Sequence, residues 1–358
     1  MEFGTLVMPQ PRRAVDDAKY AEERGFAQAW FPDSHMIYGD VYAAMALAAA
    51  NTTRIKLGTG VAVASNRIPP VTVHSIATIN EIAPGRVVLG YGNGHTGRRV
   101  MGLPPVRFAE FSEQVRVIHE LLEKGETVYN VEGLSRKIRF LHRDRRFINL
   151  DDAIPFYVAA NAPKALRLAG QYGDGLITAR VSTAARMDAI FKEVNEGARA
   201  AGRMLNGGRL PCVSLTHICV LRAGETMESP RVVDMTGHWV AAALHGVAAG
   251  FAQMLAVPAE ARPAFEAYAE YVRRMEIPKQ ELYLHLHQGH VIYLLPEERR
   301  FITPAAIKST TLVGTRAEVI ERIRALEQAG VQQLVINPPM DRYRECIDEI
   351  SRELIERM

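Results

Sequence analysis

The feature that most constrains the fold is a joint that recurs along the chain: an amphipathic helix, a glycine or turn, and a short apolar strand. The last joint covers residues 317–338, and its helical face before Gly330 carries Val319, Ile320, Ile323 and Leu326. A glycine just past a helix end adopts the left-handed conformation without a Cβ penalty. Five such joints, with apolar strands between them, predict a parallel sheet covered by helices.

Three further apolar runs bring the number of predicted strands to eight. The strands are residues 3–8, 27–32, 55–62, 87–92, 156–160, 175–179, 213–220 and 334–337. Eight strands that alternate with helices, the first at the very N-terminus, predict the α/β class and a (β/α)8 barrel of the TIM type. A doubly wound parallel sheet is the alternative that the same alternation leaves open.

Two segments interrupt the simple repeat. Residues 98–155 contain one predicted helix, Glu110–Leu122, and then a loop-rich stretch, whereas residues 221–312 are mostly helical in pattern. In a barrel, such insertions are expected to lie over the C-terminal face and to act as lids. No linker or low-complexity segment divides the chain, so we expect a single domain over residues 1–358.

The composition argues against several classes of protein. The chain is 48% hydrophobic and 23% charged, with a net charge of +3. This charge is too small to indicate binding to nucleic acid or to an anionic membrane. No apolar segment approaches the length of a membrane span, and the N-terminus lacks the pattern of a signal peptide. Three cysteines without metal-ligand spacing fit a reducing cytoplasm, where we expect the protein to be located.

If the chain is a barrel, its chemistry belongs at the C-terminal ends of the strands. The second predicted strand is followed by the sequence PDSH. A histidine with a nearby carboxylate is suited to acid–base catalysis near neutral pH, so Asp33 and His35 are the catalytic candidates. The structural alternative is that Asp33 or Ser34 caps the next helix and that His35 packs beside it.

Glycines gather after two other strands. Gly58 and Gly60 end the third strand, where a glycine indicates a bulge or the close approach of a ligand to the backbone. Gly92, Gly94 and Gly97 form G-x-G-x-x-G, the pattern of dinucleotide-binding loops. This pattern follows the fourth strand instead of opening the fold, and two prolines follow it closely. A flat ligand lying against bare backbone is therefore the favoured interpretation.

A candidate phosphate site follows the fifth strand. Asn161 and Ala162 precede Pro163, which suits the first position of a helix, and the free N–H groups of a helix N-terminus bind anions. Thr178 and Arg180, at the end of the sixth strand, could complete a phosphate cradle. Plain capping of the helix by Asn161 is the alternative.

Three histidines, His285, His287 and His290, lie in the second insertion. No carboxylate or cysteine accompanies them at a recognised spacing, so the sequence disfavours a metal site. The histidines are expected to line the lid or to lie in its core, and their role stays open.

Taken in order, five stretches resemble the luciferase-like monooxygenase superfamily. The family includes bacterial luciferase, flavin-dependent monooxygenases, and reductases that use the 8-hydroxy-5-deazaflavin coenzyme F420. The stretches are AEERGFAQAWFPDSH, TTRIKLGTGVAV, PPVTVHSIATINEIAPGRVVLGYGNG, IPFYVAANAPKALRLAGQYGDGLI and TLVGTRAEVIERIRALEQAGVQQLVI. The resemblance covers nearly the whole chain and is weakest in residues 221–312. The layout is similar to that of the methylenetetrahydromethanopterin reductases.

The resemblance implies a role for most of the candidates. In many family members the third strand ends in a bulge whose non-proline cis peptide bond presses against the central ring of the cofactor, and the matching bond is Gly60–Val61. His35 would lie near the reactive ring. The cofactor-binding residues implied by the resemblance are Gly60, Val61, Ala62, Gly92, Gly94, Ala160, Asn161, Thr178 and Arg180.

The sequence departs from the deazaflavin pattern of the family at two positions. Deazaflavin reductases usually have adjacent Asp and His residues after strand two, whereas Ser34 intervenes here, and they tend to have an acid where this chain has His95. We therefore favour a monooxygenase that receives reduced FMN from a separate flavin reductase and activates O2 to oxidise a small organic substrate. A coenzyme F420-dependent reductase or dehydrogenase is the alternative, and a non-catalytic flavin-binding relative is a lesser one. The resemblance also implies a homodimer or a higher homo-oligomer.

Overall fold

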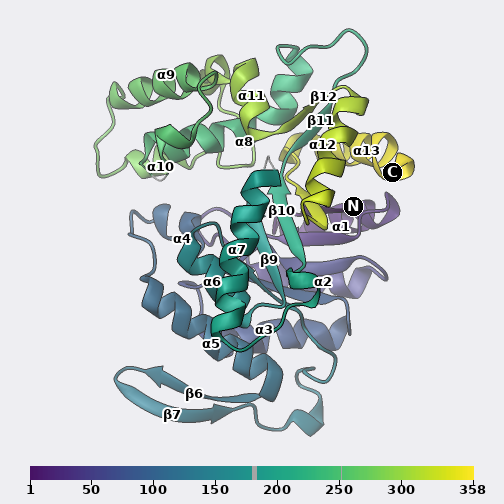
Figure 1. Ribbon diagram of the computed structural model, residues 1–358, viewed down its shortest axis with the longest axis vertical. Coiled ribbons are helices and arrows are strands. Elements are labelled where there is room, and N and C mark those ends of the chain that lie inside the picture. The colour runs from purple at the N-terminus through teal and green to yellow at the C-terminus, as the bar shows by residue number, and fades with distance from the viewer. Residues whose placement is uncertain (180–183, 251) are drawn as a thin grey trace.

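The computed structural model describes residues 1–179, 184–250 and 252–358, and its centre is a closed β-barrel (Figure 1). Among these residues, nine strands form one parallel sheet in the order β3-β2-β1-β13-β10-β9-β8-β5-β4, and β3 also pairs with β5. That pairing closes the barrel, because β3 and β4 together occupy one of its eight positions. The strands are β1 (Glu2–Leu6), β2 (Gln28–Phe31), β3 (Lys56–Thr59), β4 (Ala62–Val63), β5 (Val87–Gly92), β8 (Phe156–Ala159), β9 (Gly175–Ala179), β10 (Cys212–Thr216) and β13 (Gln333–Ile336).

The predicted (β/α)8 barrel is confirmed, and the doubly wound alternative is wrong because the sheet closes on itself. Two predicted strands differ from the observed ones. The strand predicted at residues 55–62 is split into β3 and β4 by a bulge. The strand predicted at residues 213–220 ends in the barrel at Thr216, and its last part, β11 (Ile218–Val220), pairs with β12 (Leu312–Gly314) in a separate two-stranded sheet.

Eight helices of the described residues follow the barrel strands and cover the outside of the sheet. They are α1 (Pro11–Glu23), α2 (Val41–Asn51), α3 (Pro69–Ile82), α5 (Phe108–Lys124), α6 (Pro163–Tyr172), α7 (Ala184–Ala200), α12 (Arg316–Gln328) and α13 (Tyr343–Glu353). Gly25 and Gly330, which the sequence places just past two of these helices, have φ angles of +83° and +102°. A residue with a Cβ is disfavoured in that region of backbone conformation.

The second insertion forms a layer at one end of the barrel (Figure 1). It contains α8 (Pro230–Ala248), α9 (Arg262–Arg273), α10 (Leu282–Leu286) and α11 (Pro304–Thr310). This is the arrangement expected of a lid. None of the helices in the described part of the chain is long and apolar enough to cross a membrane.

Most of the first insertion does not act as a lid. Its second half is an antiparallel ribbon of β6 (Glu126–Val131) and β7 (Leu134–Arg139), which projects at the end of the molecule away from α9 and α10 (Figure 1). The reason is that α5 runs back along the outside of the barrel and delivers the chain to the opposite end. Only the part before α5 borders the lid layer.

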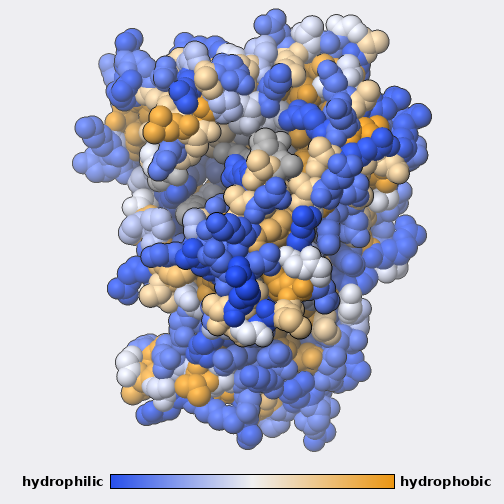
Figure 2. All heavy atoms as spheres, viewed as in Figure 1, coloured by the Kyte–Doolittle hydropathy of each residue, from blue (hydrophilic) through white to orange (hydrophobic). Residues whose placement is uncertain are grey.

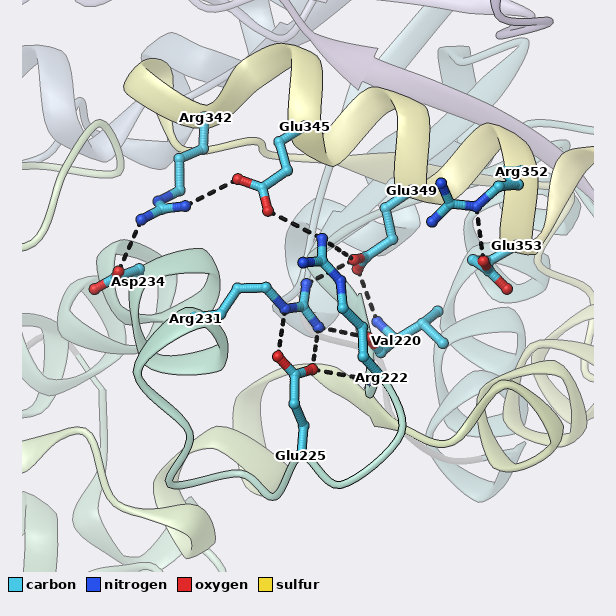
Figure 3. A network of polar contacts seen from close by, with 10 residues as sticks. All are labelled: Val220, Arg222, Glu225, Arg231, Asp234, Arg342, Glu345, Glu349, Arg352 and Glu353. Atoms are coloured by element: carbon cyan, nitrogen blue, oxygen red, sulfur yellow. Dashed lines mark hydrogen bonds and ion pairs between the residues drawn. The ribbon is translucent and has the colours of Figure 1, made fainter.

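The lid is fastened to the last helix of the barrel by a buried ionic network (Figure 3). Arg231 of α8 donates hydrogen bonds to Glu349 Oε2 of α13 at 2.6 Å and to Val220 O at 2.8 Å. Its Nε also donates to Glu225 Oε1 at 2.7 Å. Burial raises the pKa of the Glu349 carboxyl group, and the charge of Arg231 opposes that shift. The carboxylate is 2% exposed, and it also accepts a hydrogen bond from Val220 N at 3.0 Å. Arg222 Nη2 lies 3.7 Å from its Oε2, so Arg231 is its nearest cation.

We expect Arg231→Met to lower the free energy of unfolding by about 3–5 kcal/mol, because it removes the nearest cation from the buried carboxylate of Glu349 and leaves only Arg222 at 3.7 Å. The matched control is Arg352→Met, which removes an exposed ion pair with Glu353 and should cost about 0–1 kcal/mol. Equilibrium unfolding in urea measures both. Equal losses in the two variants would show that the buried pair does not fasten the lid.

Candidate active site

Trp30 of β2 fills the interior of the barrel below its C-terminal mouth. The side chain is 1% exposed, and its Nε1 donates a hydrogen bond to Gln333 Oε1 at 2.8 Å. A Cβ at any of four glycines would come within 3.2 Å of a Trp30 atom, and these are Gly4, Gly58, Gly60 and Gly90. Gly58 is the tightest, since its Cβ would lie 2.7 Å from Trp30 Cε3. The glycines at the end of β3 therefore make room for an aromatic side chain.

Between β3 and β4 the chain forms a bulge whose Gly60–Val61 peptide bond is cis, as the resemblance implied. Gly92 lies against it, since a Cβ there would be 3.0 Å from Val61 Cγ2. Gly94 has a φ angle of +57°, and a Cβ there would overlap the side chain of Val63. We expected these glycines to leave bare backbone for a ligand, but protein atoms occupy the space at their Cβ positions. Gly60, Val61 and Gly94 are only half-buried, so the bulge itself remains accessible.

Asp33 is buried and anchors this bulge. Its Oδ2 accepts hydrogen bonds from Val63 N at 3.1 Å and from Arg67 Nη1 at 2.9 Å. It does not cap α2, because the N-cap residue there is Asp40, whose Oδ1 accepts from Ala43 N at 2.9 Å. The capping alternative is therefore wrong. The catalytic role of Asp33 stays a prediction. In the structure its carboxylate, together with Arg67, holds the backbone at Val63 in place.

His35 lies at the rim of the mouth and is exposed. Its Nε2 is 3.3 Å from Met101 Sδ, and a Cβ on Gly97 would lie 3.6 Å from its Cε1. The imidazole thus faces the segment that follows β5, whereas the carboxylate of Asp33 is turned to the bulge. The two catalytic candidates are neighbours in sequence but occupy different environments.

The ends of β8 and β9 are joined by a polar contact. Thr178 Oγ1 donates a hydrogen bond to Asn161 Oδ1 at 2.8 Å, while Ala160 is buried and Asn161 is exposed. The N-cap residue of α6 is Ala162, and no side chain caps that helix. Plain capping by Asn161 is therefore wrong, and the phosphate cradle stays a prediction. Arg180 lies outside the described residues.

The structure brings most of the predicted cofactor-binding residues together on one side of the mouth. They lie on or directly beside four consecutive strands of the barrel, β4, β5, β8 and β9. These residues are Gly60, Val61, Ala62, Gly92, Gly94, Ala160, Asn161 and Thr178.

The two strands that follow β9 around the barrel, β10 and β13, carry a buried cluster that sequence reasoning missed. His217 comes directly after β10, Asn337 comes directly after β13, and His238 lies on α8. His217 Nδ1 and His238 Nε2 both donate hydrogen bonds to Asn337 O, at 2.8 Å and 2.9 Å. Burial lowers the pKa of His217 to about 3 and that of His238 to about 4, so both imidazoles are neutral near pH 7. The sequence signal that could have revealed this cluster is that His217 and Asn337 each directly follow a barrel strand.

The lid reaches the mouth through the loop after α10. His290 Nε2 lies 3.1 Å from Thr96 Oγ1, and the rings of His287 and His290 are 5.2 Å apart. Thr96 belongs to the short helix α4 (His95–Arg99), which begins directly after Gly94. Within the described ranges, no group of three or more His, Cys, Asp or Glu residues is arranged to hold a metal ion. The molecular surface is hollowed between the lid layer and the barrel below it (Figure 2).

The chain matches the family described as luciferase-like monooxygenase over residues 2–333, and it belongs to that family. The barrel, the bulge after its third strand and the lid insertion accord with this membership. The protein is a luciferase-like oxidoreductase.

The relatives in sequence include enzymes named for coenzyme F420. The chain is 27% identical to 5,10-methylenetetrahydromethanopterin reductase of Methanopyrus kandleri, over 99% of this chain and 98% of that one. It is 28% identical to the F420-dependent glucose-6-phosphate dehydrogenase of Nakamurella multipartita, over 89% of this chain and 95% of that one.

Two solved structures show how widely the fold is shared. The coenzyme F420 dependent tetrahydromethanopterin reductase from Methanopyrus kandleri superposes with a TM-score of 0.69 at 23% identity, covering 99% of this chain and 98% of that one. The oxygenating constituent of 3,6-diketocamphane monooxygenase from Pseudomonas putida, in complex with FMN, superposes with a TM-score of 0.60 at 17% identity, covering 100% and 99%. At these identities the structural likeness supports the fold alone.

We expect Gly58→Ala to lower the free energy of unfolding by about 1–3 kcal/mol, because its Cβ would press on the Trp30 ring. In a Trp30→Leu background the same change should cost less, with a coupling energy of about 0.5–3 kcal/mol. Gly246→Ala is the control, since its Cβ would meet nothing closer than Ala252 Cβ at 3.9 Å. Additive costs in the double variant would contradict the role given to Trp30.

The two buried histidines should make the protein less stable as the pH falls from about 6.5 to about 4. Their folded pKa values lie below the ordinary value of 6.5, so in this range the unfolded chain binds more protons than the folded one. The free energy of unfolding should then fall by up to about 1.4 kcal/mol per pH unit for each histidine. Urea unfolding at several pH values measures the slope. In His238→Gln the slope should be smaller by the contribution of one histidine, up to about 1.4 kcal/mol per pH unit. An unchanged slope would contradict the low pKa assigned to His238.

Proposed function

We propose that the protein is a coenzyme F420-dependent oxidoreductase that transfers a hydride between the deazaflavin and a small organic substrate. The observation that carries this proposal is the sequence likeness, over nearly the whole chain, to a methylenetetrahydromethanopterin reductase and an F420-dependent dehydrogenase. The half-buried bulge at Gly60–Val61 and the uncapped start of α6 support it.

The described residues fit such a coenzyme. Val61 is half-buried on a bulge that Asp33 and Arg67 hold in place, which gives a flat ring a firm surface. The first N–H groups of α6 receive no bond from a side-chain cap, and Asn161 is exposed beside them. Backbone N–H groups at a helix N-terminus suit a phosphate, which the coenzyme carries on the chain attached to its ring.

When bound, the deazaflavin supplies the carbon centre that gives or accepts a hydride. His35, exposed at the rim, would bind the substrate oxygen or nitrogen and exchange the proton that accompanies hydride transfer. Asp33 would act through the bulge by keeping Val63 and Arg67 in place. The lid layer would exclude water from the mouth.

The monooxygenase that the sequence analysis favoured is the second candidate. The observation in its favour is the shared fold with the FMN-bound diketocamphane monooxygenase. This candidate would need reduced FMN from a separate flavin reductase. We rank it below the deazaflavin enzyme because the reductase and the F420-dependent dehydrogenase are 27% and 28% identical to this chain, whereas the FMN-bound monooxygenase is 17% identical. A non-catalytic flavin-binding protein ranks below both. Assembly as a homo-oligomer and a cytoplasmic location stay predictions.

The test is an anaerobic fluorescence titration of the purified chain with F420 and with reduced FMN, side by side. The proposal expects tighter binding of F420. Tight binding of reduced FMN alone would overturn it in favour of the monooxygenase, and binding of neither would overturn both.

We expect Asn161→Asp to weaken coenzyme binding about tenfold, or about 1.4 kcal/mol, because it places a negative charge beside the phosphate. The same titration measures the change. The control is Asn130→Asp on the ribbon strand β6, where an equally exposed charge is added far from the mouth. Unchanged affinity in Asn161→Asp would remove the end of β8 from the coenzyme site.

A further inference from the structure

Asn337 contacts three separate segments of the chain at the mouth of the barrel: the end of β10, helix α8 and the loop after α10. Its backbone N donates a hydrogen bond to Thr216 O of β10 at 3.2 Å. Its backbone O accepts the two hydrogen bonds from His217 and His238 described above. Its side-chain Nδ2 donates to Val291 O, in the lid, at 3.1 Å. The residue is 0% exposed, so each of these contacts is shielded from water.

The backbone of Asn337 is therefore held independently of residues 287–293, by β10 and by His238 of α8. Both imidazoles donate to one carbonyl oxygen, which sets the position of the proton on each ring. The rings meet edge to face, with their centroids 5.1 Å apart, so neither can turn without moving the other. The side chain of Asn337 is thus presented to the lid from a rigid base.

The lid residue that receives this hydrogen bond has an unusual backbone. Val291 has a φ angle of +48°, which a β-branched residue rarely adopts. The next residue is also attached to the barrel, because Met340 N donates to Ile292 O at 3.1 Å. Two bonds from the segment after β13 therefore hold the loop of residues 287–293 in a conformation that it would not favour alone.

The same loop continues to the other side of the mouth. His290, next to Val291, lies with its Nε2 3.1 Å from Thr96 Oγ1 of α4. Helix α4 begins directly after Gly94, which packs on Val63 behind the bulge. The loop thus contacts the segment after β13 through Val291 and Ile292, and it contacts the helix after β5 through His290.

We propose that Asn337 is a positioning residue that fastens residues 287–293 across the barrel mouth, so that the loop covers the bound coenzyme and His290 faces the substrate side. This proposal rests on the proposed function for the identity of the coenzyme. The fastening itself depends only on the contacts of this chain.

The test compares Asn337→Leu with Asn80→Leu. The first removes the donor to Val291 O while it keeps the number of heavy atoms and the branching of the side chain at Cγ. The second removes an equally buried asparagine, whose Nδ2 donates to Asn149 O and Asp152 O at 3.1 Å and 2.9 Å. That contact lies on the α3 side of the first insertion, away from the lid. Hydrogen exchange of the ligand-free protein, followed by mass spectrometry, reports on peptides that cover residues 283–293.

Exchange in residues 283–293 should become about tenfold faster in Asn337→Leu and stay unchanged in Asn80→Leu. Met340→Pro is the second variant, because it removes the N–H that bonds Ile292 O, together with a half-buried side chain, and leaves the buried cluster of His217, His238 and Asn337 intact. It should speed exchange in the same peptides by about threefold. Unchanged exchange in Met340→Pro and in a folded Asn337→Leu would overturn the proposal.

The second arm measures how well iodide quenches the fluorescence of bound, oxidised F420. Quenching should rise several-fold in Asn337→Leu and in Met340→Pro, and it should stay at the wild-type value in Asn80→Leu. Faster exchange without increased quenching would overturn the covering role, since the loop would then be loosened without exposing the coenzyme. If the wild type binds no F420, the proposed function fails and the covering role fails with it, while exchange still decides whether Asn337 fastens the loop.

Discussion

The packing of Trp30 inside the barrel is the contact on which the geometry of the candidate site depends. The indole lies among side chains from several strands, including Leu6, Val88 and Ile177. On its other sides the indole lies directly against backbone atoms. The residues there are Gly4, Gly58, Gly60 and Gly90, which have no Cβ that would collide with Trp30. A close-packed interior leaves no room for both a large ring and ordinary side chains on these strands.

This packing explains how the bulge and the strand beside it come close together. Thr59 Oγ1 donates a hydrogen bond to Gly90 O at 2.6 Å, which ties the end of β3 to β5. The side chain of Val61 packs against Gly92. After the bulge, Asp33 accepts hydrogen bonds from Val63 N and from Arg67. The surface offered to a ligand is therefore supported from below by an aromatic ring and from the side by a buried ion pair. A site held by such contacts keeps its shape before a ligand arrives.

Most of the fold could be predicted from the periodicity of the chain. Strand positions, the first insertion's main helix and the cis bond were reached from apolar runs, glycines and the family resemblance. The sequence analysis expected residues 126–139 to lie over the barrel mouth, but the ribbon of β6 and β7 lies at the opposite end of the molecule. Its position depends on the direction in which α5 runs along the closed barrel. The catalytic role of Asp33 stays a prediction, and the sequence analysis did not foresee its contacts with Val63 and Arg67, which lie thirty and more residues away. His217, His238 and Asn337 escaped notice because they come from three distant segments and share no local motif.

The sequence by itself determined the class of the fold and the number of barrel strands, and it placed the predicted cofactor-binding residues at strand ends. These properties follow from the spacing of apolar residues, from the turn residues and from the order of the strands. All of these can be read from short stretches of the sequence. The tertiary structure alone decided which polar groups meet: Asp33 with Arg67, Arg231 with Glu349, and the Asn337 side chain with the backbone carbonyl of Val291. Partners that are far apart in sequence become neighbours only when the barrel closes and the lid settles on it. The physical reason is that a buried polar group requires a partner but does not specify in the sequence which one it will be.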